Sequence, residues 1–460
     1  MESFNYIDKV LENQKIYFES QKTKNIDFRI RQLDILKMAI EDYEDKIIKA
    51  VKLDFNKCEF ETYETEIGFV LSEIKYVRNK IKRWSKSKKV KGSLLTPGSK
   101  TYIYNQPYGV SLIISPWNYP FQLCISPLIG SIIGGNCCIV KPSELSPNTS
   151  KIIKEMIKEY FEEKYICVIE GDIQINQYLL KQKFDYIFFT GSPMVGKIVM
   201  KSAADNLIPY TLELGGKSPC IVDESCDIEL IAKRIVWGKL LNGGQTCIAP
   251  DYIIAHKNIK SRLIDSMIKY IEQFYTSNPL TSKDYTSVIN KRHFERIVSL
   301  IDYDKVIYGG NLDTQNLKIE PTIMDNVNLE DKIMKEEIFG PLIPVMKFDN
   351  TEKLLYIIKQ NPNPLALYLF TKNKKFENEI LSRVSFGGGC INDTIMHITN
   401  PNAPFGGIGN SGIGNYHGKQ SFDTFSHKKT VMKNLANIDI KFKYPPYTKK
   451  AYKILKIILK

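Results

Sequence analysis

The sequence has only five histidines, and its nine cysteines include no CxxC pair and no Cys/His cluster with the spacing of metal ligands. We therefore expect no metal site, and the unpaired cysteines favour a reducing, cytoplasmic setting. No run reaches the roughly 20 apolar residues that span a membrane, and the N-terminal segment has no apolar signal core. These absences argue against zinc modules, disulfide scaffolds and integral membrane proteins.

Cationic residues are abundant, and the formal net charge is +13. The excess is mostly lysine spread over every segment of helical pattern, and no helix-turn-helix, zinc-finger or RNP-type run accompanies it. We therefore expect solvated helix faces and no nucleic-acid partner. The length of 460 residues, with 43% hydrophobic and 25% charged residues, predicts a globular protein of two or three domains.

The pattern of apolar residues changes near residue 109. Before it, residues 1–86 have mostly helical spacing. The segment 85–108 combines lysines, Gly92, Pro97 and Gly98 with an alternating run, which is typical of a β-hairpin that leaves the main body. Such a hairpin is commonly either a loop or an assembly arm.

Strand and helix patterns alternate from residue 109 onward. The strands expected in the first alternation are 110–115, 137–140, 166–169, 186–190 and 210–214. Those expected after Cys247 are 252–255, 342–348, 366–371 and 389–392. Between the strands we expect helices, one of them after Pro147 with Asn148 or Thr149 as its cap. This order predicts an α/β fold with a doubly wound, nucleotide-binding sheet.

A glycine-rich motif, GxGxxG at residues 407–412, does not mark the nucleotide site. It follows no strand and opens no helix, so we interpret it as a tight loop near the active centre. Better candidates lie at strand ends, where open α/β sheets bind ligands. The segment Gly191–Gly196 opens a helix and could receive a pyrophosphate, and Lys141 and Glu144 could hold ribose hydroxyls or only solvate a turn.

One cysteine stands in an unusual setting. Cys247 follows two glycines and an amide, in the run NGGQTCIAP. Glycines allow close approach of the backbone to a ligand, and nearby backbone N–H groups could favour the thiolate. By itself this pattern is weak, because most cysteines are buried and only pack.

Seven stretches occur in one order between about residues 107 and 430: PYGVSLIISPWNYP, KPSE, FFTGS, LELGGKSP, NGGQTCIAPDY, EEIFGP and PFGGIGNSGIGNYHGK. This series resembles the NAD(P)-dependent aldehyde dehydrogenases, most closely their class-3 branch. The resemblance implies a Rossmann-like cofactor domain (1–86 and 109–212), a second α/β catalytic domain (213–423) and a small β bridging arm (87–108 and 424–434). The arm would close a homodimer by strand addition.

The resemblance also implies roles for three residues in the reaction. Cys247 corresponds to the nucleophile, whose thiolate attacks the aldehyde carbon to give a hemithioacetal and then a thioester. Asn118 corresponds to the side-chain amide of the oxyanion hole, with the Cys247 backbone N–H as the second donor. Glu213 corresponds to the general base that activates the hydrolytic water, and burial that raises its pKa would suit this role.

The cofactor contacts follow by the same correspondence. Glu337 would hold the hydroxyls of the nicotinamide ribose, with Phe339 against the nicotinamide. The remaining contacts are expected from Trp117, Lys141, Glu144, Gly191, Ser192 and Gly196. Because a carboxylate at Glu144 would accept hydrogen bonds from a ribose 2′-OH and repel a 2′-phosphate, we expect NAD to be preferred, with some use of NADP.

The function implied is the oxidation of medium- or long-chain aliphatic or aromatic aldehydes to carboxylic acids. Two alternatives stay open. An acylating enzyme would pass the thioester to coenzyme A, although such enzymes generally lack the glutamate found here at Glu213. A catalytically silent structural or membrane-associated homologue would have lost Cys247 or Asn118, and both are present.

The C-terminal tail, 435–460, has a basic amphipathic pattern. Lysines at 449, 453, 456 and 460 share one helical face, opposite Tyr452, Leu455 and Leu459. A helix of this kind can lie in an anionic membrane surface, so we expect peripheral membrane contact or a cover over the substrate funnel. The alternative is that its apolar face packs on the enzyme's own body or on the dimer partner.

Overall fold

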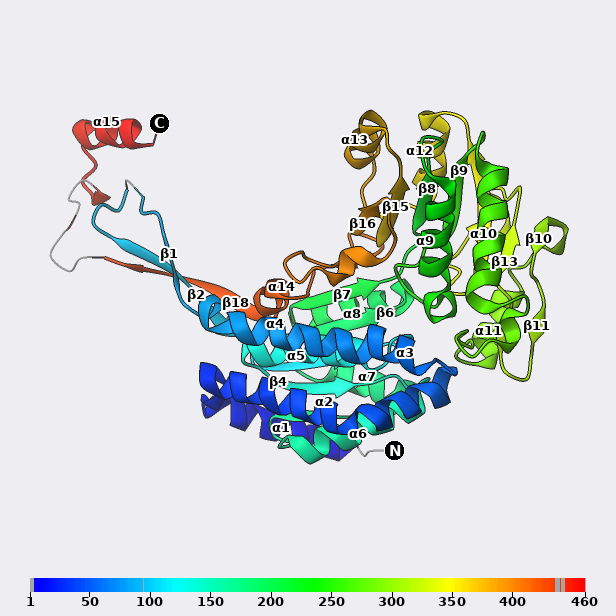
Figure 1. The fold of residues 1–460 in the computed structure, drawn as a ribbon. Helices are drawn as coiled ribbons and strands as arrows, with labels where there is room; N and C mark the ends of the chain where they lie inside the picture. The colour runs from blue at the N-terminus through cyan, green and yellow to red at the C-terminus, as the bar shows by residue number, and fades with distance from the viewer. Residues whose placement is uncertain (1–3, 94, 435–438, 440–442, 460) are drawn as a thin grey trace.

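Apolar residues at three- and four-residue spacing build the N-terminal helices α1 (Phe4–Glu19), α2 (Ile26–Phe55) and α4 (Gly68–Trp84). Between α2 and α4 lie the short helix α3 (Glu59–Thr62) and a π-helical turn, Tyr63–Ile67. The computed structural model describes residues 4–93, 95–434, 439 and 443–459 (Figure 1).

The first sheet has six strands in the order β17-β7-β6-β3-β4-β5. Its parallel strands are β3 (Val110–Ile114), β4 (Cys137–Lys141), β5 (Ile166–Val168), β6 (Tyr186–Gly191) and β7 (Tyr210–Leu214), and β17 (Gly412–Ile413) pairs antiparallel with β7. The helices of this region are α5 (Gln122–Gly134), α6 (Pro147–Tyr160), α7 (Ile173–Lys181) and α8 (Pro193–Asp205). The chain runs outward from β3 through β4 and β5 and then returns to β6 on the other side of β3. The switch point of the sheet therefore lies between β3 and β6.

The second sheet has seven strands in the order β10-β13-β14-β9-β8-β15-β16. They are β8 (Pro219–Val222), β9 (Tyr252–His256), β10 (Val306–Tyr308), β13 (Thr322–Met324), β14 (Leu342–Phe348), β15 (Ala366–Phe370) and β16 (Gly388–Ile391). Its helices are α9 (Ile228–Leu240), α10 (Lys260–Tyr275), α11 (Lys291–Val298), α12 (Thr351–Lys359) and α13 (Lys374–Arg383), and a hairpin joins β11 (Leu312–Asp313) to β12 (Lys318–Ile319). The sequence pattern did not predict β8, β10 or β13, although it predicted the equally short β5 and β16.

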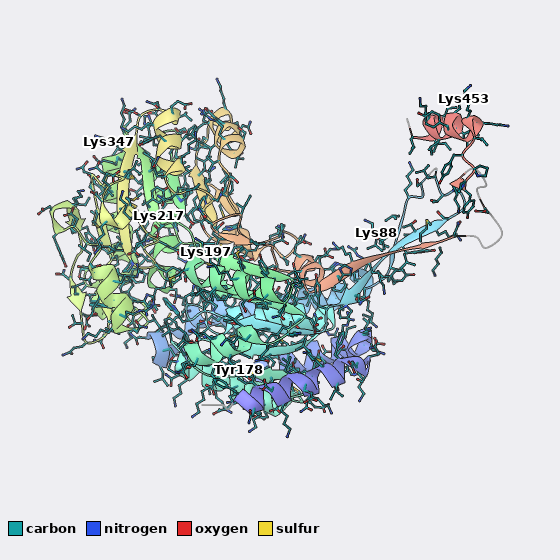
Figure 2. All side chains as sticks on the ribbon, turned by 180° about the vertical axis from the view of Figure 1, so that it is seen from behind. Lys88, Tyr178, Lys197, Lys217, Lys347 and Lys453 are labelled. Carbon is teal, nitrogen blue, oxygen red and sulfur yellow. The ribbon has the colours of Figure 1, made fainter. Side chains whose placement is uncertain are left out.

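An extended arm leaves the two domains. It consists of β1 (Lys88–Val90), β2 (Lys100–Pro107) and β18 (Ser426–Lys433), and β18 pairs with β2 over its whole length. The short helix α14 (Lys419–Thr424) leads into β18, and α15 (Lys449–Ile458) lies at the far end of the arm (Figure 1). Figure 2 shows Lys88 on the arm and Lys453 on α15, both remote from the body. Two α/β domains and a β arm confirm the predicted fold class.

The core lies around the strands of the two sheets, and every residue of β3 and β4 is buried. Both faces of these strands are covered, which explains their continuous apolar runs. Within the described ranges, no helix is both long enough and apolar enough to cross a membrane.

The predicted cap of helix α6 is wrong. Pro147 is the first helical residue and Ser146 stands at the N-cap position, where its side chain makes no capping hydrogen bond. The carboxylate of Asp54, on α2, instead accepts hydrogen bonds from the backbone N–H groups of Asn148 at 3.1 Å and Thr149 at 2.8 Å. Asn148 and Thr149 therefore do not cap the helix. Their own N–H groups are capped by a carboxylate from helix α2.

Candidate active site

The predicted site residues lie at the ends of strands from both sheets. Trp117 and Asn118 follow β3, Gly191 ends β6 and Ser192 follows it, and these are the two strands that flank the switch point. Together with residues of the second domain they line a cavity of about 280 Å³. The cavity brings together eight of the predicted residues: Trp117, Asn118, Gly191, Ser192, Glu213, Cys247, Glu337 and Phe339.

A second cavity, of about 150 Å³, adjoins the first. Its walls are mostly apolar and aromatic, including Phe69, Tyr119 and Trp237. Cys247 lines both cavities, so its thiol stands where an apolar chamber meets a more polar cleft. The arrangement can present a reactive sulfur to an apolar molecule on one side and to a polar ligand on the other.

The loop that leads to Cys247 has a strained backbone. Asn242 and Gly243, in the turn η3 (Leu241–Gly244), have φ values of 55° and 60°, and Gly244 has 78°. A side chain at Gly244 would collide with the backbone of Gly340. The glycine therefore allows this loop to pack directly on the loop that carries Glu337.

Burial, followed by the charges of Glu337 and Glu213, raises the pKa of the Cys247 thiol to about 12. Two backbone N–H groups, of Cys247 and Ile248, act in the opposite direction but do not outweigh burial. The backbone N–H groups near Cys247 therefore favour its thiolate, as predicted, but burial and the two carboxylates favour the thiol more strongly. A base has to remove the proton before the sulfur can act as a nucleophile.

Asn118 is fixed by the same loop. Its side-chain N–H donates to the backbone carbonyl of Gln245 at 3.1 Å, and its backbone carbonyl accepts from the side-chain amide of Asn242 at 2.7 Å. Asn242 also donates to the carbonyl of Gln245 at 3.1 Å. This triangle holds the amide of Asn118 beside the segment that bears Cys247.

Glu213 is buried on strand β7, opposite Gly412 of β17. Neither of its carboxylate oxygens has a hydrogen-bond partner among the described residues. Burial raises the pKa of Glu213 well above its ordinary value. The segment 407–412, rejected above as a nucleotide motif, is the loop that ends in β17, beside Glu213.

Glu337 and Phe339 lie in one loop on the other side of the cavity. Lys217 fixes this loop, because its ammonium donates to the carbonyls of Ile333 and Glu336, both at 2.8 Å, and pairs with Asp251. Burial raises the pKa of Glu337 to about 8. Phe339 has φ 51°, which is rare for an aromatic residue, and its ring lies 5.4 Å from that of Trp117.

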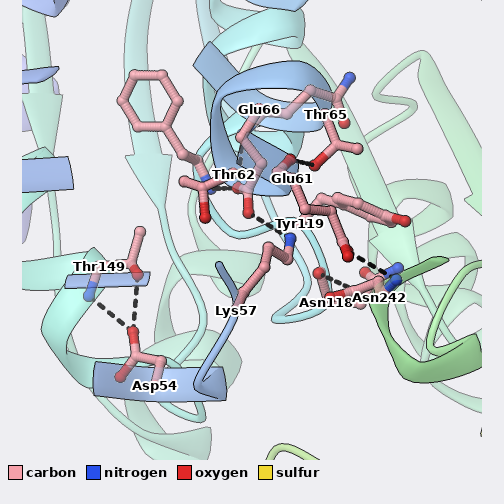
Figure 3. Close-up of polar contacts among 12 residues, drawn as sticks. Asp54, Lys57, Glu61, Thr62, Thr65, Glu66, Asn118, Tyr119, Thr149 and Asn242 are labelled. Carbon is pink, nitrogen blue, oxygen red and sulfur yellow. Dashed lines mark hydrogen bonds and ion pairs between the residues drawn. The ribbon is translucent and has the colours of Figure 1, made fainter. Parts of the chain in front are cut away.

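A buried polar network supports the site from α2, α3 and the π-helical turn (Figure 3). Glu61 accepts the backbone N–H of Asn242 at 2.7 Å, and burial raises its pKa to about 7. Glu66 pairs with Lys57 at 2.8 Å and accepts the backbone N–H of Phe121 at 2.8 Å. No sequence pattern predicted this network, because glutamates on helices usually indicate a solvated face.

Three predicted cofactor residues do not line the cavity. Lys141 is buried at the end of β4, where its ammonium bonds the carbonyl of Pro142 at 2.7 Å and reaches Glu144 at 3.3 Å. Burial lowers the pKa of Lys141, and Glu144 is largely exposed. Gly196 lies inside α8, where a side chain would press on Leu214.

Arg296 and His293 are among the lining residues that the sequence did not identify. Arg296 donates to the carbonyls of Glu337 at 3.3 Å and Ile338 at 2.6 Å, so it also fixes their loop. The ring of His293 lies 4.8 Å from that of Trp117, and burial lowers its pKa to about 4. Both stand on α11 without a motif around them. In the described part of the chain, no group of histidine, cysteine or acidic side chains could hold a metal ion.

Comparison with known proteins gives a consistent result. The model of the aldehyde dehydrogenase family matches residues 5–431. The 4,4′-diaponeurosporen-aldehyde dehydrogenase of Staphylococcus aureus is 45% identical over 99% of this chain and 100% of its own length. The dimeric NADP-preferring aldehyde dehydrogenase of Canis lupus familiaris is 41% identical over 96% of this chain and 98% of its own. Further relatives are named family 3 members, so the class-3 resemblance is confirmed.

The structure is also similar to a solved one. The substrate-bound state of Staphylococcus aureus AldH covers 100% of both chains with a TM-score of 0.97 and 45% identity. The similarity extends over the arm as well as the two domains.

Proposed function

The chain belongs to the aldehyde dehydrogenase family and oxidises aldehydes to carboxylic acids with NAD(P)⁺, and we propose that Cys247 and Glu213 perform the two covalent steps of this reaction. The observation that supports the proposal is the position of Cys247 at the junction of the apolar and polar cavities, where Glu213 lines the polar one.

In the first step the Cys247 sulfur attacks the carbonyl carbon of an aldehyde that enters through the apolar cavity. The proton leaves the sulfur for a carboxylate, and Glu337 and Glu213 are the two whose charges act on the thiol. The oxygen of the resulting hemithioacetal receives hydrogen bonds from the Asn118 amide and the Cys247 backbone N–H. The bond to Gln245 fixes the Asn118 amide in place for this task.

In the second step Glu213 removes a proton from water, and the water oxygen attacks the thioester carbon. Burial raises the pKa of Glu213, which makes its carboxylate a stronger proton acceptor. The carbon–sulfur bond breaks, the carboxylic acid leaves, and Cys247 regains its proton. The presence of Glu213 favours hydrolysis over transfer to coenzyme A, and Cys247 with Asn118 argues against a silent homologue.

The cleft has the features that a dinucleotide needs. When bound, NAD(P)⁺ would supply the hydride acceptor that the conversion of the hemithioacetal to the thioester requires. The strained Phe339 and Trp117 form an aromatic wall for the nicotinamide, and Glu337 would hold its ribose. The start of α8, with Gly191, Ser192 and Gly196, would receive phosphates. Lys141 and Glu144 lie at the next strand end, at a suitable place for the adenine ribose, and we propose that NAD is preferred.

The apolar chamber determines the substrate class. Its aromatic and aliphatic lining suits medium- or long-chain aliphatic or aromatic aldehydes. One relative is named for an aldehyde of diaponeurosporene, which is consistent with an extended apolar substrate. The range of aldehydes accepted by this chain is a proposal, which a substrate profile over chain length tests.

We also propose the division of the chain into a cofactor domain (1–86 and 109–212), a catalytic domain (213–423) and a bridging arm (87–108 and 424–434). In the three-stranded arm β18 is an edge strand. An exposed edge can receive a further strand, so the arm is suited to join two copies of the chain. The dimeric relative supports a homodimer.

The tail contains a helix where the lysine spacing predicted one, although Lys460 and residues 435–438 and 440–442 lie outside the described residues. The apolar side chains of Tyr452 and Ile457 on α15, and of Leu459 at its C-cap, are exposed. We propose that this helix gives a cytoplasmic enzyme peripheral contact with an anionic membrane surface. Salt-dependent co-sedimentation with anionic vesicles should be lost in a chain ending at Tyr444, and equal partitioning would indicate packing on the dimer or the body instead.

The reaction itself is tested with aldehyde and NAD, with and without coenzyme A. Production of NADH and free acid without coenzyme A is the expected result. The Cys247→Ser variant should lose oxidation while it keeps cofactor binding, because the proposed cofactor contacts lie on other residues. Acid formation that depends on coenzyme A would overturn the hydrolytic step, and oxidation by Cys247→Ser would overturn the nucleophile.

A further inference from the structure

A third cavity, of about 130 Å³, lies beside the apolar chamber. The two share Phe69, Ile398 and Thr399 in their walls, so they are neighbours at the side of the chamber that these residues form. The proposed reaction uses none of the polar residues of this third cavity.

The polar wall of the cavity is a buried pair, Glu73 and His417. Their side chains are only 5% and 4% exposed, and His417 Nδ1 lies 3.4 Å from Glu73 Oε1. The same Oε1 accepts the backbone N–H of Gly418 at 3.4 Å. The other polar atoms, Glu73 Oε2 and His417 Nε2, have no hydrogen-bond partner among the residues described.

The surroundings hold these two atoms in place. His417 has φ 75°, and its backbone N–H donates to Ser421 at 2.9 Å. Its ring stacks on Tyr416 at 4.0 Å and meets the edge of Phe69 at 5.4 Å. A buried polar atom without a partner is costly, and this one belongs to a fixed ring that lines a cavity. Such a group indicates a ligand with hydrogen-bonding capacity.

We propose that the Glu73–His417 cavity is a subsite for a hydroxyl group carried on the chain of the aldehyde. The inference rests on the proposed function, because the ligand enters through the apolar chamber. A hydroxyl both donates and accepts, so with a proton on His417 Nε2 it can accept from that nitrogen and donate to Glu73 Oε2. The carboxylate of Glu73 disfavours an anionic group here, since the lining contains no lysine or arginine.

The test compares kcat/KM for a series of alkanals of increasing length with the matched ω-hydroxyalkanals and ω-aminoalkanals. At the length that reaches the subsite, the hydroxyl should raise kcat/KM about ten-fold, mainly through KM, because the contact is remote from the reacting atoms. A hydroxyl that gives no gain at any length overturns the subsite. A larger gain from the amine overturns the assignment to a hydroxyl. Activity with plain alkanals shows in the same assay that the proposed function holds.

Two variants assign the effect to the pair. Glu73→Gln keeps the oxygen that binds Gly418 and replaces the free acceptor with a donor, and His417→Asn suits a residue with positive φ. Each should reduce the preference for the hydroxyl several-fold, with the thermal midpoint as a check on folding. The exposed Glu330→Gln serves as the matched control and should leave the preference unchanged. A preference that persists in both variants would contradict the proposal.

Discussion

Glu66 and Glu213 are both buried carboxylates, but their surroundings are opposite. Glu66 has an ammonium from Lys57 on one oxygen and a backbone N–H from Phe121 on the other. Glu213 has no hydrogen-bond partner on either oxygen among the described residues. One carboxylate is satisfied by the fold, and the other faces a cavity with its bonding capacity unused.

This difference in pairing distinguishes a carboxylate that stabilises the fold from one that can exchange a proton. A paired buried charge keeps its protonation state and holds chain segments together, because removing either partner leaves an uncompensated charge. An unpaired buried carboxylate has a raised pKa and can take up or release a proton. Glu66 therefore fixes the segment that follows Asn118, while both oxygens of Glu213 keep their hydrogen-bonding capacity for the role proposed above.

The largest effect is expected from Glu213→Gln. Steady-state turnover should fall about 10²- to 10⁴-fold, because an amide cannot take a proton from water. The first turnover should survive, so a burst of NADH should precede the slow phase in stopped-flow absorbance. Turnover at the parent rate would show that Glu213 is not the base.

The same variant should not lose stability. A glutamate with a raised folded pKa ionises more readily in the unfolded chain, so it disfavours folding increasingly as pH rises above about 4.3, the ordinary value. Glu213→Gln removes this penalty, and its unfolding free energy relative to wild type should therefore increase from pH 5 to pH 8. Urea unfolding at both pH values measures the change, and a decrease would mean that Glu213 is paired in solution.

The second prediction concerns the paired carboxylate. Lys57→Met should lower the unfolding free energy by about 3–5 kcal/mol, because it leaves Glu66 charged and buried without its partner. Lys37→Met is the control, since Lys37 and Glu41 form an exposed pair for which about 0.3–0.5 kcal/mol is expected. If urea unfolding gives equal losses for both, the Lys57–Glu66 pair does not support the fold.

The comparison of Glu66 with Glu213 also shows how much of the site the sequence could predict. Asn118, Glu213 and Cys247 lie in short, specific stretches, and the fold brings all three to one cavity. Glu61 and Glu66 stand on helices with no distinguishing neighbours, and their partners are far away along the chain. Their role depends on tertiary contacts that no local pattern contains.

The secondary structure shows the same division between features that a local pattern predicts and features that depend on tertiary contacts. Long strands such as β14 and β15 were predicted to within one residue, because five to seven apolar residues define a buried strand. Strands β8 and β13 were missed, although β5 and β16 are as short and were predicted. The cap of α6 was misassigned because its carboxylate, Asp54, is 94 residues away from Asn148.

The third prediction concerns Glu337, a carboxylate that is intermediate between the paired Glu66 and the unpaired Glu213. Glu337 accepts a backbone N–H from Gly216, and its charge raises the pKa of the Cys247 thiol. Glu337→Gln should therefore move the pH profile for alkylation of Cys247 by iodoacetamide to lower pH in the protein without cofactor. Mass spectrometry of the Cys247 peptide measures the rate, with Glu330→Gln as the control. An unchanged profile would exclude Glu337 as a determinant of thiol reactivity.

The smallest effect is expected where the carboxylate is exposed. Glu144 is 42% exposed and reaches the ammonium of Lys141 at 3.3 Å, so water and this cation both screen its charge. If Glu144 lies at the adenine ribose, its charge disfavours a 2′-phosphate, and Glu144→Gln should raise kcat/KM for NADP relative to NAD. The gain should be only about five-fold, as for a screened interaction near 1 kcal/mol, and it should shrink as salt is added. The exposed Glu170→Gln, whose carboxylate pairs with Lys154 at 3.3 Å, is the matched control. A ratio that does not change in Glu144→Gln at low salt would place the determinant of cofactor preference elsewhere.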